Sequence, residues 1–253
     1  MGWLTIIPTP IGNLEDITLR ALRLLREADV VLAEDTRTTL KLLRHFEISP
    51  RELRSHHMHN EHTTAKSIAT AIADGQKVVL VSDAGTPGIS DPGFILVREC
   101  LLLNLKVECL PGATAFVPAL VASGLPCDRF SFEGFLPQKK GRQTLLEDIS
   151  KRTTTTILYE APTRLLKLLE QLSILLEPER EVVVVREISK IHEEYHRGTS
   201  SELCEYFRNQ PPRGEIVVLI APSPTPERVH KNKYKESLSP SCLTSEKITL
   251  KQI

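Results

Sequence analysis

The chain has 253 residues, of which 41% are hydrophobic and 25% charged, so we expect a globular protein with one large core or two smaller ones. Its 32 Lys and Arg balance 32 Asp and Glu, which excludes a general electrostatic attraction to a polyanion and requires local basic patches for such a partner. The five cysteines include no C-x-x-C pair, which argues against a disulfide framework or a cysteine-type zinc site. Without a signal peptide or a long apolar run, the sequence predicts a soluble cytoplasmic protein that does not enter a membrane.

Strand and helix patterns alternate along the first half of the chain, which predicts right-handed crossovers and a parallel sheet. The first helix has Asp16 as its expected N-cap. The expected strands are 3–8, 29–33, 77–82 and 106–110, and the expected helices are 17–28, 38–46, 63–73, 92–104 and 113–123.

A second α/β unit with a mixed sheet is expected after the Gly-Leu-Pro punctuation that begins at Gly124. The chain then divides into an N-terminal domain, 1–124, a C-terminal domain, 125–222, and a flexible tail, 223–253, in which six Lys and Arg face three Asp and Glu. The expected strands of the second unit are 130–133, 154–159, 181–186, 193–197 and 215–221, and its expected helices are 142–149, 162–176 and 200–209.

The most informative stretch is residues 82–93, which read SDAGTPGISDPG after an apolar strand. Glycine lets a backbone approach a ligand closely, and proline fixes a turn. Open α/β sheets bind small molecules at the carboxyl ends of their strands, where this loop falls. A plain strand-to-helix connection is the alternative, but such connections usually take about two to six residues.

Three more loops follow predicted strands. Residues 8–14 contain neither a dinucleotide-binding nor a P-loop fingerprint, which argues against both kinds of site. Residues 34–37 place two carboxylates, a hydroxyl and a guanidinium together, although Asp35 or Thr36 could simply cap the next helix. Residues 111–115 have small side chains that suit a flat, adenosine-like ligand.

The most basic stretch of the expected folded part is residues 135–142, with three positive charges beside a glycine. Phosphate contact is the functional interpretation, and a solvated run of charge is the alternative. Four histidines within residues 56–62 raise the possibility of zinc. We do not predict a metal there, because Asn60 is typical of a helix N-cap and breaks the helical spacing of the histidines.

Seven stretches together resemble the tetrapyrrole-methylase superfamily, and more narrowly its RsmI-type 16S rRNA (cytidine-2'-O)-methyltransferases. The resemblance implies two α/β domains with an S-adenosyl-L-methionine site in the cleft between them, and a homodimer. It implies methyl transfer to the ribose of a cytidine in the decoding centre of 16S rRNA, as free RNA or in the assembled small ribosomal subunit, without a metal. The stretches are 8–14, 33–37, 82–93, 110–112, 132–137, 159–160 and 186–187.

The resemblance assigns the cofactor residues one by one, and the chemistry of methyl transfer suggests catalytic and RNA-binding candidates beside them. A ribose hydroxyl is a poor nucleophile, so a base or a charge that stabilises the oxyanion is expected, from Asp35, Lys139 or Lys190. RNA phosphate or ribose would be oriented by Asn13, Arg37, Lys140, Arg142 and Arg164. The cofactor would lie against Pro10, Ile11, Gly12, Asp83, Ala84, Gly85, Thr86, Ile89, Thr114, Ala115, Tyr159, Glu160, Gly214 and Glu215.

Two other functions remain open from the sequence. A methyltransferase of the same fold could act on a corrinoid, another tetrapyrrole or a diphthine-type substrate, although corrin enzymes usually show Gly-Pro-Gly-Asp where this chain has Pro-Ile-Gly-Asn. A non-catalytic RNA-binding module is the other alternative, and it would leave the elaborate ligand loops unexplained.

Overall fold

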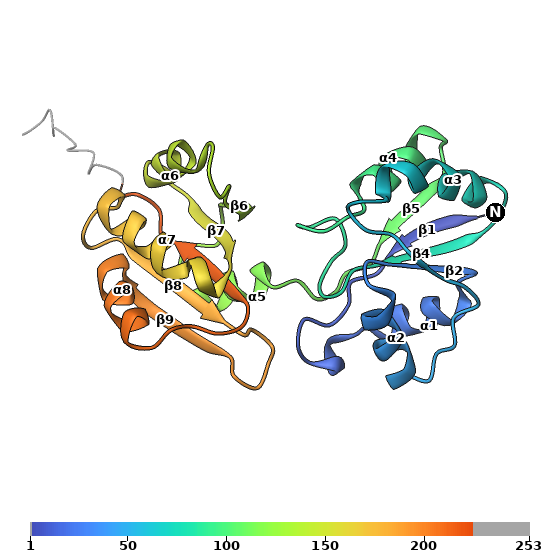
Figure 1. The fold of residues 1–253 in the computed structure, drawn as a ribbon, viewed down its shortest axis with the longest axis horizontal. Coiled ribbons are helices and arrows are strands. Elements are labelled where there is room, and N and C mark those ends of the chain that lie inside the picture. Colours follow the sequence, from blue (N-terminus) through green and yellow to red (C-terminus); the bar gives the residue numbers. More distant parts are fainter. Residues whose placement is uncertain (1, 225–253) are drawn as a thin grey trace, which may run out of the picture.

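The computed structural model describes residues 2–224 and shows two α/β units (Figure 1). The expected flexible tail, 223–253, lies almost entirely outside the described residues. Between residues 2 and 224, no helix has the length and apolar character needed to cross a membrane.

The first unit is built on a parallel five-stranded sheet with the order β3-β2-β4-β1-β5, as the alternating pattern predicts. The central strands β2 and β4 are buried along almost their whole length, which explains why their sequences are continuous apolar runs. The strands are β1 (Trp3–Ile6), β2 (Val30–Ala33), β3 (Leu53–Ser55), β4 (Lys77–Val81) and β5 (Lys106–Cys109).

Helices cover both faces of this sheet. Helices α1 (Leu19–Glu27) and α2 (Thr36–His45) pack on one face, and α3 (Glu61–Ala73) and α4 (Phe94–Leu102) pack on the other. A short 3-10 helix, η1 (Leu14–Asp16), precedes α1. The expected cap at Asp16 is wrong: Thr18 caps α1, and its hydroxyl accepts a hydrogen bond from the Ala21 amide at 3.1 Å.

The second unit contains a mixed sheet with the order β6-β7-β10-β8-β9, in which only β6 and β7 pair in parallel. Helices α6, α7 and α8 cover one face, and α5 covers the other. The strands are β6 (Phe130–Phe135), β7 (Thr155–Glu160), β8 (Glu181–Arg186), β9 (Glu194–Thr199) and β10 (Ile216–Ile220), and the helices are α5 (Phe116–Ser123), α6 (Arg142–Ser150), α7 (Pro162–Leu175) and α8 (Ser200–Asn209).

Helix α5 belongs with the second sheet. Its Ala119 and Leu120 are buried against apolar residues of β7, β8 and β10. The chain therefore crosses from one unit to the other before α5, and the expected boundary at Gly124 falls one helix too late. The Gly-Leu-Pro signal has a local cause: Gly124 ends α5 in the left-handed conformation, with φ +88°, which glycine adopts at no steric cost.

Candidate active site between the two sheets

The loops after β1, β4 and β5 form one connected structure at the carboxyl ends of the strands. Thr9 and Gly85 exchange main-chain hydrogen bonds of 2.9 Å in both directions. The Thr9 hydroxyl donates to the Ser82 carbonyl at 3.1 Å, and the Thr86 hydroxyl donates to the Ala113 carbonyl at 3.0 Å. These bonds bring together three of the loops that the sequence singles out.

Two glycines of the predicted cofactor set have conformational or steric reasons to be glycine. Gly85 has φ +81°, a left-handed conformation that other residues rarely adopt. Gly12 packs against the second unit: a Cβ atom there would lie 2.4 Å from Cγ of Lys190 and 2.8 Å from the Ser189 carbonyl oxygen. The loop after β1 therefore touches the turn after β8 directly.

A cavity of about 450 Å³ lies at this contact between the two units. The Ser189 hydroxyl and the Asp16 carboxylate form a hydrogen bond beside it and join the units. Of the predicted cofactor residues, Ile11 and Thr114 line the cavity. Its full lining is Ile11, Asp16, Gly112, Ala113, Thr114, Val117, Pro118, Ile188, Ser189, Glu193 and Tyr195.

Three predicted residues of the second unit lie at the turn after β8. Lys190 belongs to the turn, and Gly214 and Glu215 lie against it. Lys190 Nζ lies 2.8 Å from Glu187 Oε1 and 3.3 Å from Glu215 Oε2. Partial burial lowers the pKa of Lys190, but the two carboxylates outweigh burial and raise it overall. Lys190 therefore stays protonated and cannot act as a base, although its charge suits oxyanion stabilisation. Gly214 leaves room for Glu187, whose carboxyl group would lie 2.2 Å from a Cβ atom.

Tyr159 and Glu160, at the end of β7, have different surroundings. Burial raises the pKa of Tyr159, and polar interactions with Thr114 and the Phe116 backbone partly offset this rise. The Glu160 carboxylate is 2% exposed and faces two arginines instead: its Oε1 accepts from Arg164 Nε at 2.7 Å, and its Oε2 lies 3.5 Å from Arg142 Nη2. The Glu160 carboxylate therefore holds two arginines in place and does not line the cavity.

Arg142 is not placed to contact RNA, in contrast to the expectation from the sequence. It is 6% exposed, and its guanidinium donates to Gln171 Oε1 at 2.9 Å in addition to facing Glu160. Lys139 and Lys140, in the loop before α6, are exposed and remain available to a phosphate. Arg142 therefore anchors the basic loop, and the lysines form its accessible part.

Asp35 caps α2. Its carboxylate accepts from the Arg37 amide at 2.8 Å and accepts three further hydrogen bonds from the Arg37 guanidinium, the shortest of them 2.6 Å. These bonds lower the pKa of Asp35 to about 2. A carboxylate with so low a pKa is a weak proton acceptor, so the capping alternative describes Asp35 better than the role of a general base. Arg37 is held in the same pair, on the surface.

Two acidic residues beside Asp35 are absent from the predicted site. Burial, together with the negative charges of Glu34 and Asp83, raises the pKa of Asp91 to about 6, although an interaction with Ser82 opposes the rise. Burial also raises the pKa of Glu34, and the negative charge of Asp83 adds to this rise. The Ser-Asp-Pro motif in the loop after β4 is the only sequence signal for Asp91, and it says nothing about burial.

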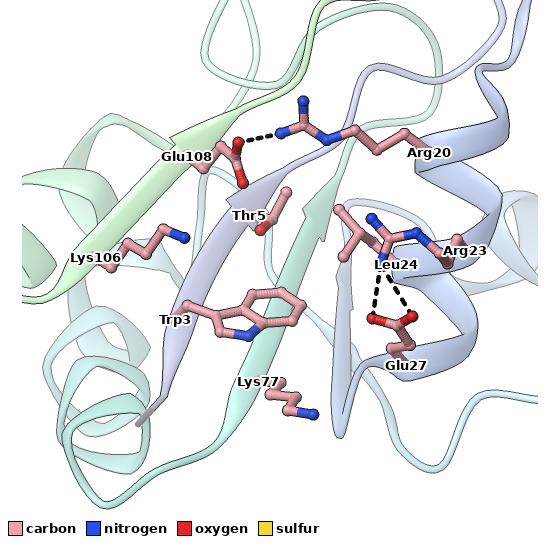
Figure 2. Close-up of a pocket in the computed structure, with 9 residues that line it drawn as sticks. All are labelled: Trp3, Thr5, Arg20, Arg23, Leu24, Glu27, Lys77, Lys106 and Glu108. Carbon is pink, nitrogen blue, oxygen red and sulfur yellow. Dashed lines mark hydrogen bonds and ion pairs between the residues drawn. The ribbon is translucent and has the colours of Figure 1, made fainter.

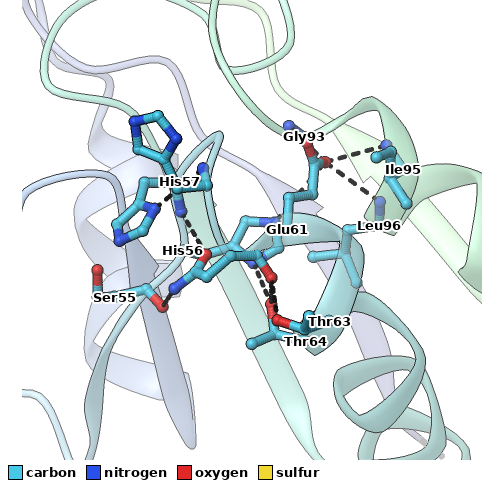
Figure 3. Close-up of polar contacts among 11 residues, drawn as sticks. Ser55, His56, His57, Glu61, Thr63, Thr64, Gly93, Ile95 and Leu96 are labelled. Carbon is cyan, nitrogen blue, oxygen red and sulfur yellow. Dashed lines mark hydrogen bonds and ion pairs between the residues drawn. The ribbon is translucent and has the colours of Figure 1, made fainter.

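The end of this loop is fixed by a buried carboxylate from α3 (Figure 3). Glu61 Oε1 accepts from the amides of Gly93 at 2.9 Å and Ile95 at 3.0 Å, at the N-terminus of α4, which has no cap of its own. His56 is fully buried, and its Nδ1 lies 3.2 Å from the Thr64 hydroxyl. The histidine stretch thus supports the loop, and residues 2–224 contain no cluster of His, Cys, Asp and Glu suited to a metal ion.

A second hollow, about 350 Å³ in volume, lies between α1 and the edge of the first sheet (Figure 2). Four of its charged side chains form ion pairs, Arg20 with Glu108 and Arg23 with Glu27. Trp3, which also lines it, opens β1, so this hollow is away from the strand ends where the ligand loops meet. We assign no ligand to it.

Fold and site together define a two-unit α/β protein with a small-molecule cavity between the units. The tetrapyrrole (corrin/porphyrin) methylase family model matches residues 4–204. The chain belongs to the tetrapyrrole methylase family.

Among curated proteins, ribosomal RNA small subunit methyltransferase I of Synechocystis sp. is 48% identical over 228 residues, which cover 90% of this chain and 81% of that protein. The protein of the same name in Thermotoga maritima is 44% identical over 221 residues, covering 87% and 99%. The chain thus spans most of the length of both relatives.

Solved structures of more distant proteins share the fold. A cobalt precorrin-4 methyltransferase of cobalamin biosynthesis matches with a TM-score of 0.64 at 22% identity, covering 87% of this chain and 94% of that one. A uroporphyrin-III C-methyl transferase from Thermus thermophilus, complexed with S-adenosylhomocysteine, matches with a TM-score of 0.60 at 22% identity, covering 87% and 97%. At this identity, the likeness concerns the fold alone.

Proposed function

We propose that this protein is an S-adenosyl-L-methionine-dependent methyltransferase that modifies the ribose 2'-hydroxyl of a cytidine in the decoding centre of 16S rRNA. The two relatives named ribosomal RNA small subunit methyltransferase I, 48% and 44% identical, support this reaction class and substrate. The observation on this chain that carries the proposal is the cavity between its units, which is lined by the loops after β1 and β5 and by the turn after β8. Such a substrate places the reaction in the cytoplasm.

The residues around the cavity fit the cofactor. Its volume of about 450 Å³ lies within the range of about 300–1,000 Å³ that is common for small-molecule sites. Ile11, Val117 and Tyr195 offer apolar surface for an adenosine group, while Thr114 and the backbone of Ala113 offer polar contacts. When bound, S-adenosyl-L-methionine supplies a methyl group already activated by its positive sulfur.

The protein's own residues must align the ribose hydroxyl and exclude water. They must also accept the proton of that hydroxyl and stabilise the negative charge that develops on its oxygen. Lys190, protonated beside the cavity, is suited to stabilise negative charge that develops on the ribose oxygen. Asp91, with a pKa of about 6, is mostly ionised near pH 7 and is a better proton acceptor than Asp35. Lys139 and Lys140 would hold RNA phosphate at the entrance.

Isothermal titration with S-adenosyl-L-methionine and labelled methyl transfer to small ribosomal subunits test this proposal together. We expect one cofactor bound per chain and label incorporated into 16S rRNA. A folded protein that does not bind the cofactor would contradict the site. If the protein binds the cofactor and methylates a corrinoid but not rRNA, the cofactor site is supported and the proposed substrate is wrong.

We also propose that the chain forms a homodimer. Apolar side chains of α4 support this, since Phe94, Leu101 and Leu102 are 68%, 57% and 66% exposed, and patches of this kind are typical of protein interfaces. Light scattering of the purified protein measures its mass in solution. The proposal predicts twice the chain mass for the wild type and a shift toward monomer for Leu101→Lys, whereas a monomeric wild type would contradict it.

A further inference from the structure

We propose that Phe135 and Arg164 form a stacking platform for a base of the RNA strand that carries the target ribose. This inference rests on the proposed function and specifies how the protein binds its RNA substrate. Sequence-tolerant stacking on aromatic rings, with phosphate held by nearby cations, is the usual way in which proteins bind unstacked RNA.

The first observation is that Phe135 is an exposed aromatic side chain on the cavity side of the second sheet. It is 54% exposed, at the end of the edge strand β6. It pairs in register with Tyr159, which packs with the core cluster on the α5 face of the sheet. Residues paired across neighbouring strands share a face, so Phe135 lies on the side of Tyr159 rather than with α6 and α7.

A β-bulge produces this orientation. The register between β6 and β7 shifts between Phe132 and Gly134, so that one extra residue, Glu133, is accommodated. Gly134 takes φ +59° at this point. In a regular strand without a bulge, Phe132 and Phe135 would lie on opposite faces, because they are three residues apart and side chains alternate along a strand. Bulges commonly redirect a side chain next to an active site, and this one turns Phe135 to the face that carries Tyr159.

The position of the bulge also connects the platform to the ligand loops. A Cβ atom on Gly134 would lie 3.0 Å from the Ser90 hydroxyl oxygen, so the loop after β4 touches β6 next to Phe135. The Phe135 ring lies 5.7 Å from the Tyr159 ring, centroid to centroid, and Tyr159 packs against the same apolar cluster as Ile11 and Ile188 of the cavity wall. A base on Phe135 would therefore be close to the site of methyl transfer.

The third observation is the guanidinium of Arg164. Its central carbon lies 6.0 Å from the centroid of the Phe135 ring, and its Nε is fixed by the buried Glu160 carboxylate at 2.7 Å. Within residues 2–224, its two terminal nitrogens have no hydrogen-bond partner. A planar cation that is held by one edge and open at the other is suited to a phosphate oxygen. Lys139 and Lys140 follow Phe135 closely and extend the positive surface.

Substitutions of Phe135 test whether its ring contributes to RNA binding. Binding is measured by fluorescence anisotropy with a labelled single-stranded RNA of about 10 nucleotides, within the size range of such sites. We expect Phe135→Ala and Phe135→Leu to weaken binding by about 5- to 150-fold, because base stacking has this magnitude, while Phe135→Trp keeps or improves it. Phe130→Ala is the matched control, since Phe130 is 44% exposed at the opposite end of the same strand and should leave binding unchanged.

Two further results would decide the matter. Unchanged S-adenosyl-L-methionine affinity in every variant shows that the fold and the cofactor site are intact. RNA binding by Phe135→Leu equal to that of the wild type would overturn the platform, because leucine keeps the apolar bulk and lacks the ring. If the wild type binds RNA through Phe135 but transfers no methyl group to rRNA, the platform stands and the proposed function fails; if the wild type transfers methyl and Phe135→Ala binds RNA normally, only the platform fails.

Discussion

Replacement of Glu61 by alanine tests whether the ligand loop after β4 depends on a carboxylate from α3. Glu61 is 7% exposed, and its Oε1 accepts from the amides of Gly93, Ile95 and Leu96 at 2.9, 3.0 and 3.4 Å. The substitution leaves these amides at the start of α4 without their acceptor. Each well-formed hydrogen bond to a charged group contributes about 1.5–3 kcal/mol, and loss of a helix cap costs about 0.5–2 kcal/mol.

Because the three bonds share one oxygen and are not additive, we expect Glu61→Ala to lower the free energy of unfolding by about 3 kcal/mol. Glu61→Gln keeps an acceptor oxygen and should lose about half as much. Urea unfolding followed by circular dichroism measures both variants. His62→Ala is the control, since His62 is the exposed neighbour on the same helix. A loss below about 0.5 kcal/mol for Glu61→Ala, the usual scatter of surface substitutions, would show that the carboxylate does not hold the loop.

Three further predictions concern titration, capping and charge. The raised pKa of Asp91 means that the folded state favours its neutral form, so stability is lost as the pH rises from about 4 through about 6; Asp91→Asn should therefore gain stability relative to the wild type between pH 4 and pH 7, and a constant difference in urea midpoints across that range would contradict this. Asp35→Asn should keep the single-turnover methylation rate within about threefold, because asparagine caps a helix as well as aspartate does, and a loss of about 100-fold would restore Asp35 as a general base. Lys139→Glu combined with Lys140→Glu should weaken binding to rRNA and flatten its dependence on salt without changing cofactor affinity, and an unchanged salt slope would remove the basic loop from the RNA interface.

Much of the architecture follows from patterns that sequence shows directly. The strand predicted at 181–186 and the helix predicted at 200–209 are confirmed by β8 and α8, whose bounds are the same. The parallel sheet of the first unit is confirmed, because continuous apolar runs that alternate with amphipathic helices leave few other arrangements. Strand β3 escaped prediction because it has three residues, only one of them apolar, and is defined by pairing with β2.

The candidate site shows where such patterns stop being informative. A basic run looks the same whether its last member is solvated or buried, and only the fold reveals that Arg142 faces Glu160 while Lys139 stays exposed. The same holds for two aspartates near strand ends: Asp35 is paired with Arg37 and has a lowered pKa, whereas Asp91 is partly buried and has a raised one. Proton affinity depends on surroundings from several segments of the chain, which spacing in the sequence does not encode.

The proposed function requires that the cavity between the two units holds S-adenosyl-L-methionine for methyl transfer to the ribose of 16S rRNA. The most direct test incubates the purified protein with labelled S-adenosyl-L-methionine and small ribosomal subunits that lack the modification, and then maps the labelled nucleotide. We expect a single labelled cytidine in the decoding centre, resistant to alkaline cleavage because its 2'-oxygen is methylated. Label on a base rather than a ribose, or no label in 16S rRNA from a protein that binds the cofactor, would contradict it.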